Sequence, residues 1–336
     1  MADKFDIWLA GVLDAGTDPV AGLRQARLLD PSPDYGDIAR TTASLVERTG
    51  LLGLASVWGG PQLAGRHFLG FGTEAQRAEW RGRVLAVAIS EPNAGAHPKL
   101  LTTRVDPVPG GFRITGRKAW VTNGASADAI IVFAIAAHEA GRKRYSAFIV
   151  PRDSTGLTIA EMPGFHALRP SRHCQMTLDG CEVTDSAMLG DPGSAYDRMA
   201  MPFRDIEDAV GTFATLGALR HAIGLFAGTH GEDQAEALGA IAALTAVFAA
   251  AAETVVASLD AGQFGIGDAT LVGLRVLAID TVSRLRALQP ATGTRSHRLA
   301  ALIADLDATL SVARGPRLAR QLHLGTVALR GAKLPA

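Results

Sequence analysis

The sequence predicts a multidomain α and β protein: an N-terminal helical domain, a central β-barrel or sandwich, and a C-terminal four-helix bundle. Apolar residues recur at spacings of three and four near the N-terminus and again from about Tyr196 onward. The stretch between them holds short alternating runs separated by Gly and Pro. A chain of 336 residues, 48% of them hydrophobic, is long enough for two or three domains. We expect domain boundaries at 1–85, 86–195 and 196–336.

Residues 1–85 should form helices joined by loops. Leu23–Leu29 and Ile38–Leu54 carry apolar residues at helical spacing. Thr73 is followed three residues later by Gln76, which is the pattern of a capping box, so a helix should start there and continue to about Arg83.

The middle of the chain should be a β domain. Thr102–Gly116 is typical of a hairpin, because two alternating runs flank a Pro-Gly-Gly turn. Several short strands separated by turn residues favour a sandwich or a small barrel. Further strands are expected at 120–122, 129–136, 146–150, 157–162, 174–178 and 181–183.

Four long apolar helices should follow and form the bundle. They are expected at 205–227, 234–259, 268–287 and 296–312, with a fifth at 317–329. Ala237–Leu259 is long and apolar, but most of it is alanine, which buries little area. We interpret this segment as a buried bundle helix and expect no membrane span.

Composition excludes some classes of function. Lys and Arg number 33, as do Asp and Glu, and there is no polybasic run, so we expect no nucleic-acid partner. A net charge near zero is compatible with self-association. The two cysteines suggest no disulfide framework and the N-terminus has no signal-peptide pattern, which together predict a reducing, cytoplasmic location.

A metal site is also not expected. His166, His173, Cys174 and Cys181 lie close together in the sequence, but their spacing matches no standard zinc pattern. We interpret them as ordinary strand and loop residues.

Two segments carry the functional signal. Residues 88–96 read Ala-Ile-Ser-Glu-Pro-Asn-Ala-Gly-Ala, and residues 116–124 read Gly-Arg-Lys-Ala-Trp-Val-Thr-Asn-Gly. Each alone would be a turn or a core strand. Together, in this order and between helical flanks, they resemble the acyl-CoA dehydrogenase family, whose segments read roughly Thr-Glu-Pro-x-Ala-Gly-Ser and Gly-x-Lys-x-Trp-Ile-Thr-Asn. The resemblance covers about residues 70–220, and the chain looks like a short, divergent member.

The resemblance implies FAD as cofactor and an oxidoreductase of fatty acid metabolism that acts on CH-CH donors. Trp120 would cover one face of the flavin ring, and Thr122 would bond near its N5 atom. It also implies an acyl-CoA substrate, an electron-transfer flavoprotein as electron acceptor, and a homodimer or homotetramer. The flavin-contacting positions by resemblance are Ala88, Ile89, Ser90, Gly95, Ala96, Trp120, Val121, Thr122 and Thr326.

The family's catalytic glutamate occupies one of two sequence positions. The later one, just before a Gly-Thr pair, is Leu324 here, and leucine cannot accept a proton. The earlier one, at the start of the bundle, is Glu207, which the resemblance implies as the base. The neighbouring position is Asp208, where the family usually has Arg. The alternative is that Glu207 is an exposed acid near a helix N-terminus, favoured there by the helix dipole.

Three departures leave a second function open. Ala96 replaces the serine that closes the first flavin segment, residues 227–232 replace an Arg-x-x-Phe-Gly motif, and the later Gln-x-x-Gly-Gly segment is absent. In the family, the last two motifs grip the ADP half of the flavin. The alternative is therefore a non-catalytic or half-site subunit of a heteromeric acyl-CoA dehydrogenase that needs a related partner. A third reading is a relative that uses flavin on a non-CoA substrate.

Overall fold

The computed structural model describes residues 4–13, 18–226, 234–263, 268–288 and 294–331. The chain separates into two compact units, which are described one at a time. The first unit contains residues 1–33, 56–166 and 170–204, and the second contains 34–55, 167–169 and 205–336. The three domain boundaries expected from the sequence remain predictions.

The first unit is a sheet with short helices. Its helices are α1 (Lys4–Leu13), α2 (Pro19–Gln25), most of α4 (Gly53–Leu63), η1 (Ala64–Phe68), η2 (Leu69–Phe71), α5 (Glu74–Trp80), η3 (Asp185–Ala187) and η4 (Tyr196–Ala200). Its strands are β1 (Leu85–Ala88), β2 (Arg104–Val108), β3 (Gly111–Thr122), β4 (Ala129–Glu139), β5 (Arg142–Pro151), β6 (Leu157–Glu161), β7 (His173–Thr184) and β8 (Met188–Leu189).

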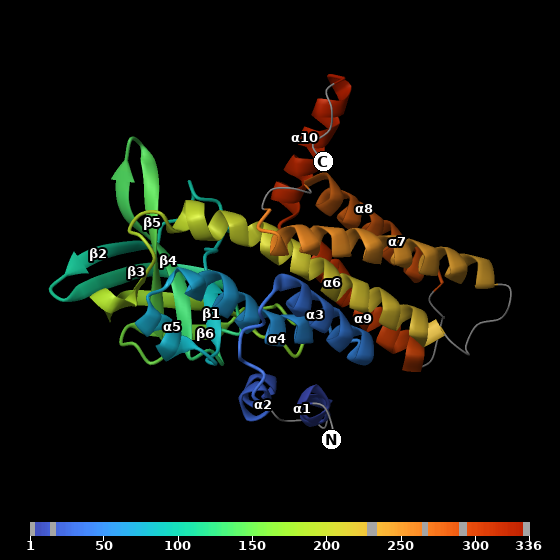
Figure 1. The fold of residues 1–336 in the computed structure, drawn as a ribbon, viewed down its shortest axis with the longest axis horizontal. Coiled ribbons are helices and arrows are strands. Elements are labelled where there is room, and N and C mark those ends of the chain that lie inside the picture. Colours follow the sequence, from blue (N-terminus) through green and yellow to red (C-terminus); the bar gives the residue numbers. More distant parts are fainter. Residues whose placement is uncertain (1–3, 14–17, 227–233, 264–267, 289–293, 332–336) are drawn as a thin grey trace. The chain divides into compact units, whose positions relative to one another are not determined.

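The eight strands form one mixed sheet (Figure 1). Its order is β6-β7-β3-β2-β4-β5-β8, with β1 also paired to β4. The β1–β4 and β2–β4 pairs are parallel and the others antiparallel. Residues 129–135 of β4 and 145–150 of β5 are buried, so these two strands form the centre of the apolar core.

Local sequence signals account for several of these elements. The Thr73 backbone N–H donates to Gln76 Oε1 at 2.8 Å and the Gln76 N–H donates to Thr73 Oγ1 at 3.2 Å, so the predicted capping box is confirmed at the start of α5. The predicted hairpin is also confirmed, since β2 and β3 pair on either side of Pro109 and Gly110. The helix–β–helix order predicted from the sequence is therefore correct.

Two strand predictions are wrong. The run 120–122 was expected as a strand of its own but is the end of β3. The runs 174–178 and 181–183 were expected as separate strands, but both belong to β7. Ile114 of β3 pairs with Cys181 of β7 and Gly116 pairs with Leu178, so β7 carries one extra residue over this step. Gly180, within that step, has a φ of 62°. A bulge absorbs the extra residue without ending the strand, which the sequence pattern alone does not reveal.

The second unit is helical (Figure 1). It contains α3 (Tyr35–Thr49), α6 (Met201–Phe226) from residue 205 onward, α7 (Ala235–Asp260), α8 (Asp268–Ala287), α9 (Thr294–Ser311) and α10 (Arg314–Leu329). Helix α7 packs on α3 and α8, and α8 also contacts α9 and α10. All five helices predicted after residue 205 are present.

Helix α7 departs from the expected full burial. Its buried residues form a stripe that includes Ile241, Phe248 and Val255, whereas Val247 is exposed. By length and apolar composition, the helical stretches 196–226 and 235–260 are the two in the described residues that would be able to cross a membrane. In the most apolar window of the second stretch only 33% of residues are buried, because α7 has helical neighbours on only part of its circumference.

Candidate functional site

The segment after β1 folds into a tight turn. The Glu91 N–H donates to Gly95 O at 2.9 Å and the Gly95 N–H donates to Glu91 O at 3.1 Å. Asn93 and Gly95 both have positive φ, a backbone region that Gly and Asn tolerate better than other residues. The turn directs the Glu91 side chain inward, away from solvent.

Glu91 is the centre of a buried polar network. Its carboxylate accepts hydrogen bonds from the Thr102 N–H at 2.7 Å, the Thr102 hydroxyl at 2.8 Å and the Thr103 N–H at 2.9 Å. Lys118 Nζ, on β3, lies 3.0 Å from the same carboxylate. The Lys118 side chain is 0% exposed and that of Glu91 is 4% exposed, so the ion pair is dry. A Cβ at Gly116 would meet Thr103 Cα at 2.7 Å, so β3 requires glycine there to approach this network.

The pKa values reflect that environment. Burial alone would raise the pKa of Glu91, but the Lys118 charge and the hydrogen bonds from Thr103 and Thr102 outweigh it and lower the pKa to about 2. Burial lowers the pKa of Lys118 to about 8, against the opposing pull of Glu91. At neutral pH both groups are charged.

The network joins the two segments that carried the sequence signal. The Ala119 N–H donates to Ser90 O at 2.9 Å, and Lys118 Nζ donates to Ile89 O at 3.1 Å. The turn at Ser90 and the strand at Trp120 are therefore parts of one surface. This contact is what the family resemblance predicted.

Trp120 stands outward from this surface. Lys118, Ala119 and Val121 are buried, while Trp120 is 47% exposed. A bulge between Lys118 and Val121, with a Trp120 φ of 60°, interrupts the inward–outward alternation and turns the indole out. Its ring meets the ring of Phe165 edge-on at a centroid distance of 5.2 Å. A left-handed backbone conformation is strained for tryptophan, and residues held in such conformations cluster at functional sites. The outward-facing Trp120 is therefore a candidate binding residue.

Other predicted contact residues surround it. Ala88 ends β1 and is buried, Ser90 and Thr122 are half-buried, and Gly95 lies on the exposed side of the turn. The structure records no hydrogen bond from the Ser90 or Thr122 hydroxyl to the described residues. Both hydroxyls are thus available to a ligand.

Sequence reasoning missed several residues that build this surface. Glu91 and Lys118 were not among the predicted site residues, although a lysine at an inward position of an apolar strand is a signal for a buried ion pair. Tyr196 was also missed. Its hydroxyl donates to Ala96 O at 2.7 Å, which fixes the end of the turn.

In the second unit, the predicted base lies among charged residues. Glu207 is on α6, and its side chain is exposed to solvent. The next residue, Asp208, lies 2.5 Å from Arg317 Nη2 and 3.6 Å from Arg320 Nη1, both on α10. Arg320 also pairs with Asp205 at 2.6 Å. The structure therefore supplies, from α10, the arginines that pair with Asp208.

This cluster shifts the pKa of Glu207. Although the Glu207 side chain is accessible to solvent, the dense protein around it and the negative charge of Asp208 raise its pKa to about 7, and Arg317 partly opposes them. A carboxyl group with a pKa near neutrality exchanges protons readily at the pH where cells operate, as a general base requires.

The remaining predicted positions are on α10 or outside the described residues. Leu324 and Thr326 are half-buried on α10, and the Thr326 hydroxyl donates to Leu322 O at 2.9 Å. Residues 227–232, which replace a family motif, lie outside the described residues. Within the described part of the chain, no group of three or more His, Cys, Asp or Glu side chains is arranged to hold a metal ion.

Comparison with known protein sequences gives matches in the same region. Residues 86–181 match the family described as acyl-CoA dehydrogenase, middle domain. Mitochondrial isovaleryl-CoA dehydrogenase of Arabidopsis thaliana is 30% identical over 155 residues, covering 44% of this chain and 38% of that protein. The acyl-CoA dehydrogenase of Bacillus subtilis (strain 168) is 31% identical over 132 residues, covering 38% of this chain and 35% of that protein. The chain thus spans little more than a third of the length of these relatives.

Solved structures extend the likeness to the fold of the whole chain. Butyryl-CoA dehydrogenase from Megasphaera elsdenii aligns with a TM-score of 0.80 and 18% identity, covering 94% of this chain and 90% of that chain. TdsC from Paenibacillus sp. A11-2, in a complex with FMN and indole, aligns with a TM-score of 0.79 and 19% identity, covering 99% of this chain and 96% of that chain. At these identities the likeness establishes the fold.

Proposed function

We propose that the chain belongs to the acyl-CoA dehydrogenase family and catalyses the FAD-dependent α,β-dehydrogenation of an acyl-CoA thioester. Residues 86–181 match the middle domain of that family, and the chain has the fold of butyryl-CoA dehydrogenase. The observation that carries the proposal is the single surface formed by the Ser90 turn and the outward-facing Trp120. In the reaction, a base removes a proton from the carbon next to the thioester carbonyl, and a hydride leaves the following carbon.

The residues of that surface fit a flavin. Trp120 offers an exposed aromatic face, and the Ser90 and Thr122 hydroxyls are hydrogen-bond donors without a partner among the described residues. Ile89, Gly95 and Ala96 would line the same surface. Ala88 and Val121 are buried beneath it, and Thr326 belongs to the other unit, so these three stay contacts predicted by resemblance alone. FAD, when bound there, supplies the hydride acceptor. The protein's part is to orient the acyl group and exclude water.

Glu207 is the proposed base. Its elevated pKa keeps the carboxylate basic enough to take a carbon-bound proton, while a substantial fraction is still deprotonated at neutral pH. The pairs formed by Arg317 and Arg320 neutralise Asp205 and Asp208, so that Glu207 is the carboxylate of this cluster without an ion pair among the described residues.

Replacing Glu207 by Gln tests the assignment. The amide keeps the size of the side chain but cannot accept the proton, so kcat should fall about 10²- to 10⁴-fold while flavin content stays unchanged. Turnover of an acyl-CoA series with an artificial electron acceptor, together with the flavin absorbance of the purified protein, measures both quantities. Glu236→Gln, an exposed acid on α7, is the matched control and should leave kcat unchanged. Full activity in Glu207→Gln would refute the assignment.

A second function has its own support. Leu324 stands where most family members have the base, and exposed apolar side chains on α7, α8 and α10 (Val247, Val276, Ile279, Leu318 and Leu322) offer a surface for another subunit. In this alternative the chain is a half-site subunit of a heteromeric acyl-CoA dehydrogenase. Flavin content decides between the two. A yellow homomer that bleaches with acyl-CoA supports the complete enzyme, and a colourless protein that gains flavin only with a related subunit supports the alternative.

The remaining elements of the proposal concern partners and location. We place the enzyme in the cytoplasm, as a homodimer or homotetramer, with an electron-transfer flavoprotein as electron acceptor. The exposed apolar residues on α7, α8 and α10 support association with another subunit, whether a second copy or a related chain. Sedimentation of the purified protein gives the oligomeric state.

A further inference from the structure

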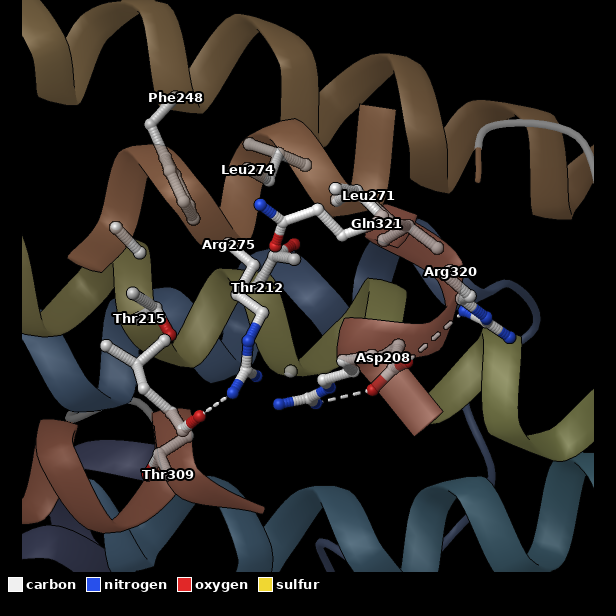
Figure 2. A pocket seen from close by; sticks show the side chains of 15 residues that line it. Asp208, Thr212, Thr215, Phe248, Leu271, Leu274, Arg275, Thr309, Arg320 and Gln321 are labelled. Carbon is white, nitrogen blue, oxygen red and sulfur yellow. Dashed lines mark hydrogen bonds and ion pairs between the residues drawn. The ribbon is translucent and has the colours of Figure 1, made fainter. Parts of the chain in front are cut away.

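The helical unit contains a pocket that the proposed reaction does not use. It lies among α6, α7, α8, α10 and the C-terminal end of α9, and its cavity volume is about 80 Å³ (Figure 2). A cavity needs roughly 10–15 Å³ to hold one water molecule, so this one has room for several waters or a small ligand. Asp208 lines the pocket, but the neighbouring Glu207 does not.

The charged groups of the pocket are mostly cationic. Arg275, Arg317 and Arg320 line it together with one carboxylate, that of Asp208. Asp208 is already shared between Arg317 and Arg320, as the dashed contacts in Figure 2 show. No second carboxylate lines the pocket among the described residues, so it keeps an excess of positive charge.

Arg275 is the group left without a counter-charge. Its Nη2 donates to Leu310 O, whereas its Nη1 is buried and has no hydrogen-bond partner in the described part of the chain. Burial and the nearby cations Arg317 and Arg314 lower the pKa of Arg275, against the weaker effect of Asp208. A buried charged donor without an acceptor costs free energy, which an oxyanion beside it would recover.

The rest of the lining limits the ligand. Phe248 and Leu274 give the pocket an apolar wall, while Thr215 adds a buried residue whose hydroxyl has no hydrogen bond to the described residues. We propose that this pocket binds a small oxyanion, a carboxylate or a phosphate, with Arg275 as its principal hydrogen-bond donor. The pocket volume admits the free ion or the anionic end of a larger metabolite.

The test is anion binding by the full-length protein. Inorganic phosphate and acetate are titrated separately at constant ionic strength set with KCl, and the thermal midpoint is recorded. Specific binding to the folded state raises the midpoint and saturates. Acetate acting alone identifies a carboxylate site, and phosphate acting alone identifies a phosphate site. Equal midpoints in phosphate, acetate and KCl would overturn the proposal.

Variants of Arg275 localise the response. Arg275→Met should weaken the apparent affinity at least tenfold, and Arg275→Lys, which keeps the charge but not the planar donor fork, should weaken it less. Arg284→Met is the matched control on the same helix, since Arg284 is exposed and pairs with Asp280, and it should leave binding unchanged. A saturable response of equal affinity in Arg275→Met would place the ion elsewhere and refute the site.

A stability readout separates ligand binding from a structural role. Without added anion, Arg275→Met should be as stable as the parent protein or more stable, because it removes an unsatisfied buried donor. A large drop in the thermal midpoint would mean that Arg275 serves the fold. Thr215→Val then provides the second variant: it should weaken anion binding if the pocket is the site, and unchanged affinity would overturn the proposal. Because Glu207 does not line the pocket, this result is independent of whether the dehydrogenase proposal holds.

Discussion

The sheet unit and the helical unit each contain an acid–base cluster, and the two clusters differ in how completely their charges are satisfied. Glu91 and Lys118 are dry, and the Glu91 carboxylate accepts bonds from Lys118, Thr102 and Thr103. The pair of Asp208 and Arg317 is about 20% exposed, and beside it lie Glu207 with a raised pKa and Arg275 with an unpaired nitrogen. A satisfied cluster fixes geometry, whereas an unsatisfied one retains the capacity to exchange protons and bind ions.

The largest expected effect follows from breaking the satisfied cluster. Glu91→Gln leaves the Lys118 ammonium buried without a counter-charge, so the free energy of unfolding should fall by about 3–5 kcal/mol. Urea or thermal unfolding followed by Trp fluorescence measures the change. Glu182→Gln, which breaks the exposed pair with Arg113, is the control and should cost less than about 1 kcal/mol. Similar losses in the two variants would remove the distinction between buried and exposed pairs.

The double variant Glu91→Gln/Lys118→Met sharpens the same point. Since each single variant leaves a buried charge unpaired, the double variant should lose less stability than the sum of the two.

The stability that Glu91 contributes should depend on pH in a defined direction. The folded pKa of Glu91 is below its ordinary value, so its contribution is complete above about pH 4.5 and is lost as the pH falls toward 2. Glu91→Gln should lack this part of the acid unfolding.

A smaller effect is expected at the exposed face of the sheet. Trp120→Ala removes one aromatic surface from the proposed flavin site, which should weaken FAD binding by about 0.5–1.5 kcal/mol, or roughly two- to ten-fold in Kd. Quenching of flavin fluorescence during titration of the apoprotein gives the Kd. Trp120→Phe should retain most of the affinity. Leu100→Ala, an exposed apolar residue of the same unit, should leave it unchanged. An unaltered Kd in Trp120→Ala would place the flavin elsewhere.

The smallest effect is expected in the pH profile. The free-enzyme kcat/KM should fall on the acid side with an apparent pKa of about 7, since protonated Glu207 cannot act as base. Arg317 holds the pKa of Glu207 down and also neutralises Asp208, so Arg317→Met should move the acid limb to higher pH by less than about one unit. Arg286→Met, which breaks an exposed pair with Asp307, is the control. A limb that moves to lower pH contradicts the assignment.

The sequence predicted local features better than long-range ones. The capping box at Thr73 and Gln76 and the hairpin at Pro109 and Gly110 are set by neighbouring residues, and both are present. The contact between the Ser90 turn and the Trp120 strand followed from resemblance. The ion pair of Lys118 with Glu91 was not predicted from the sequence. The bulge that turns Trp120 outward was not predicted either, because it depends on how β3 pairs with β7 and not on the residues of β3 alone.

The charges of α10 show the same limit. Arg317 pairs with Asp208 and Arg320 with Asp205, across sequence separations of 109 and 115 residues. No local sequence pattern predicts pairs so far apart. The family position occupied by Asp208 usually holds a cation, and the compensating cations come from another helix. The role of Glu207 as base remains a prediction that the pKa shift and this neutralisation support.

Helix α10 has a further property that follows from how it is attached. None of its residues is buried, its later part stands away from the bundle (Figure 1), and its ties to α6 are the arginine–aspartate pairs. Apolar packing resists ionic strength, but partly exposed ion pairs weaken as mobile ions screen them. Added salt should therefore weaken the attachment of α10 to α6, while the contacts of α10 with α8 persist.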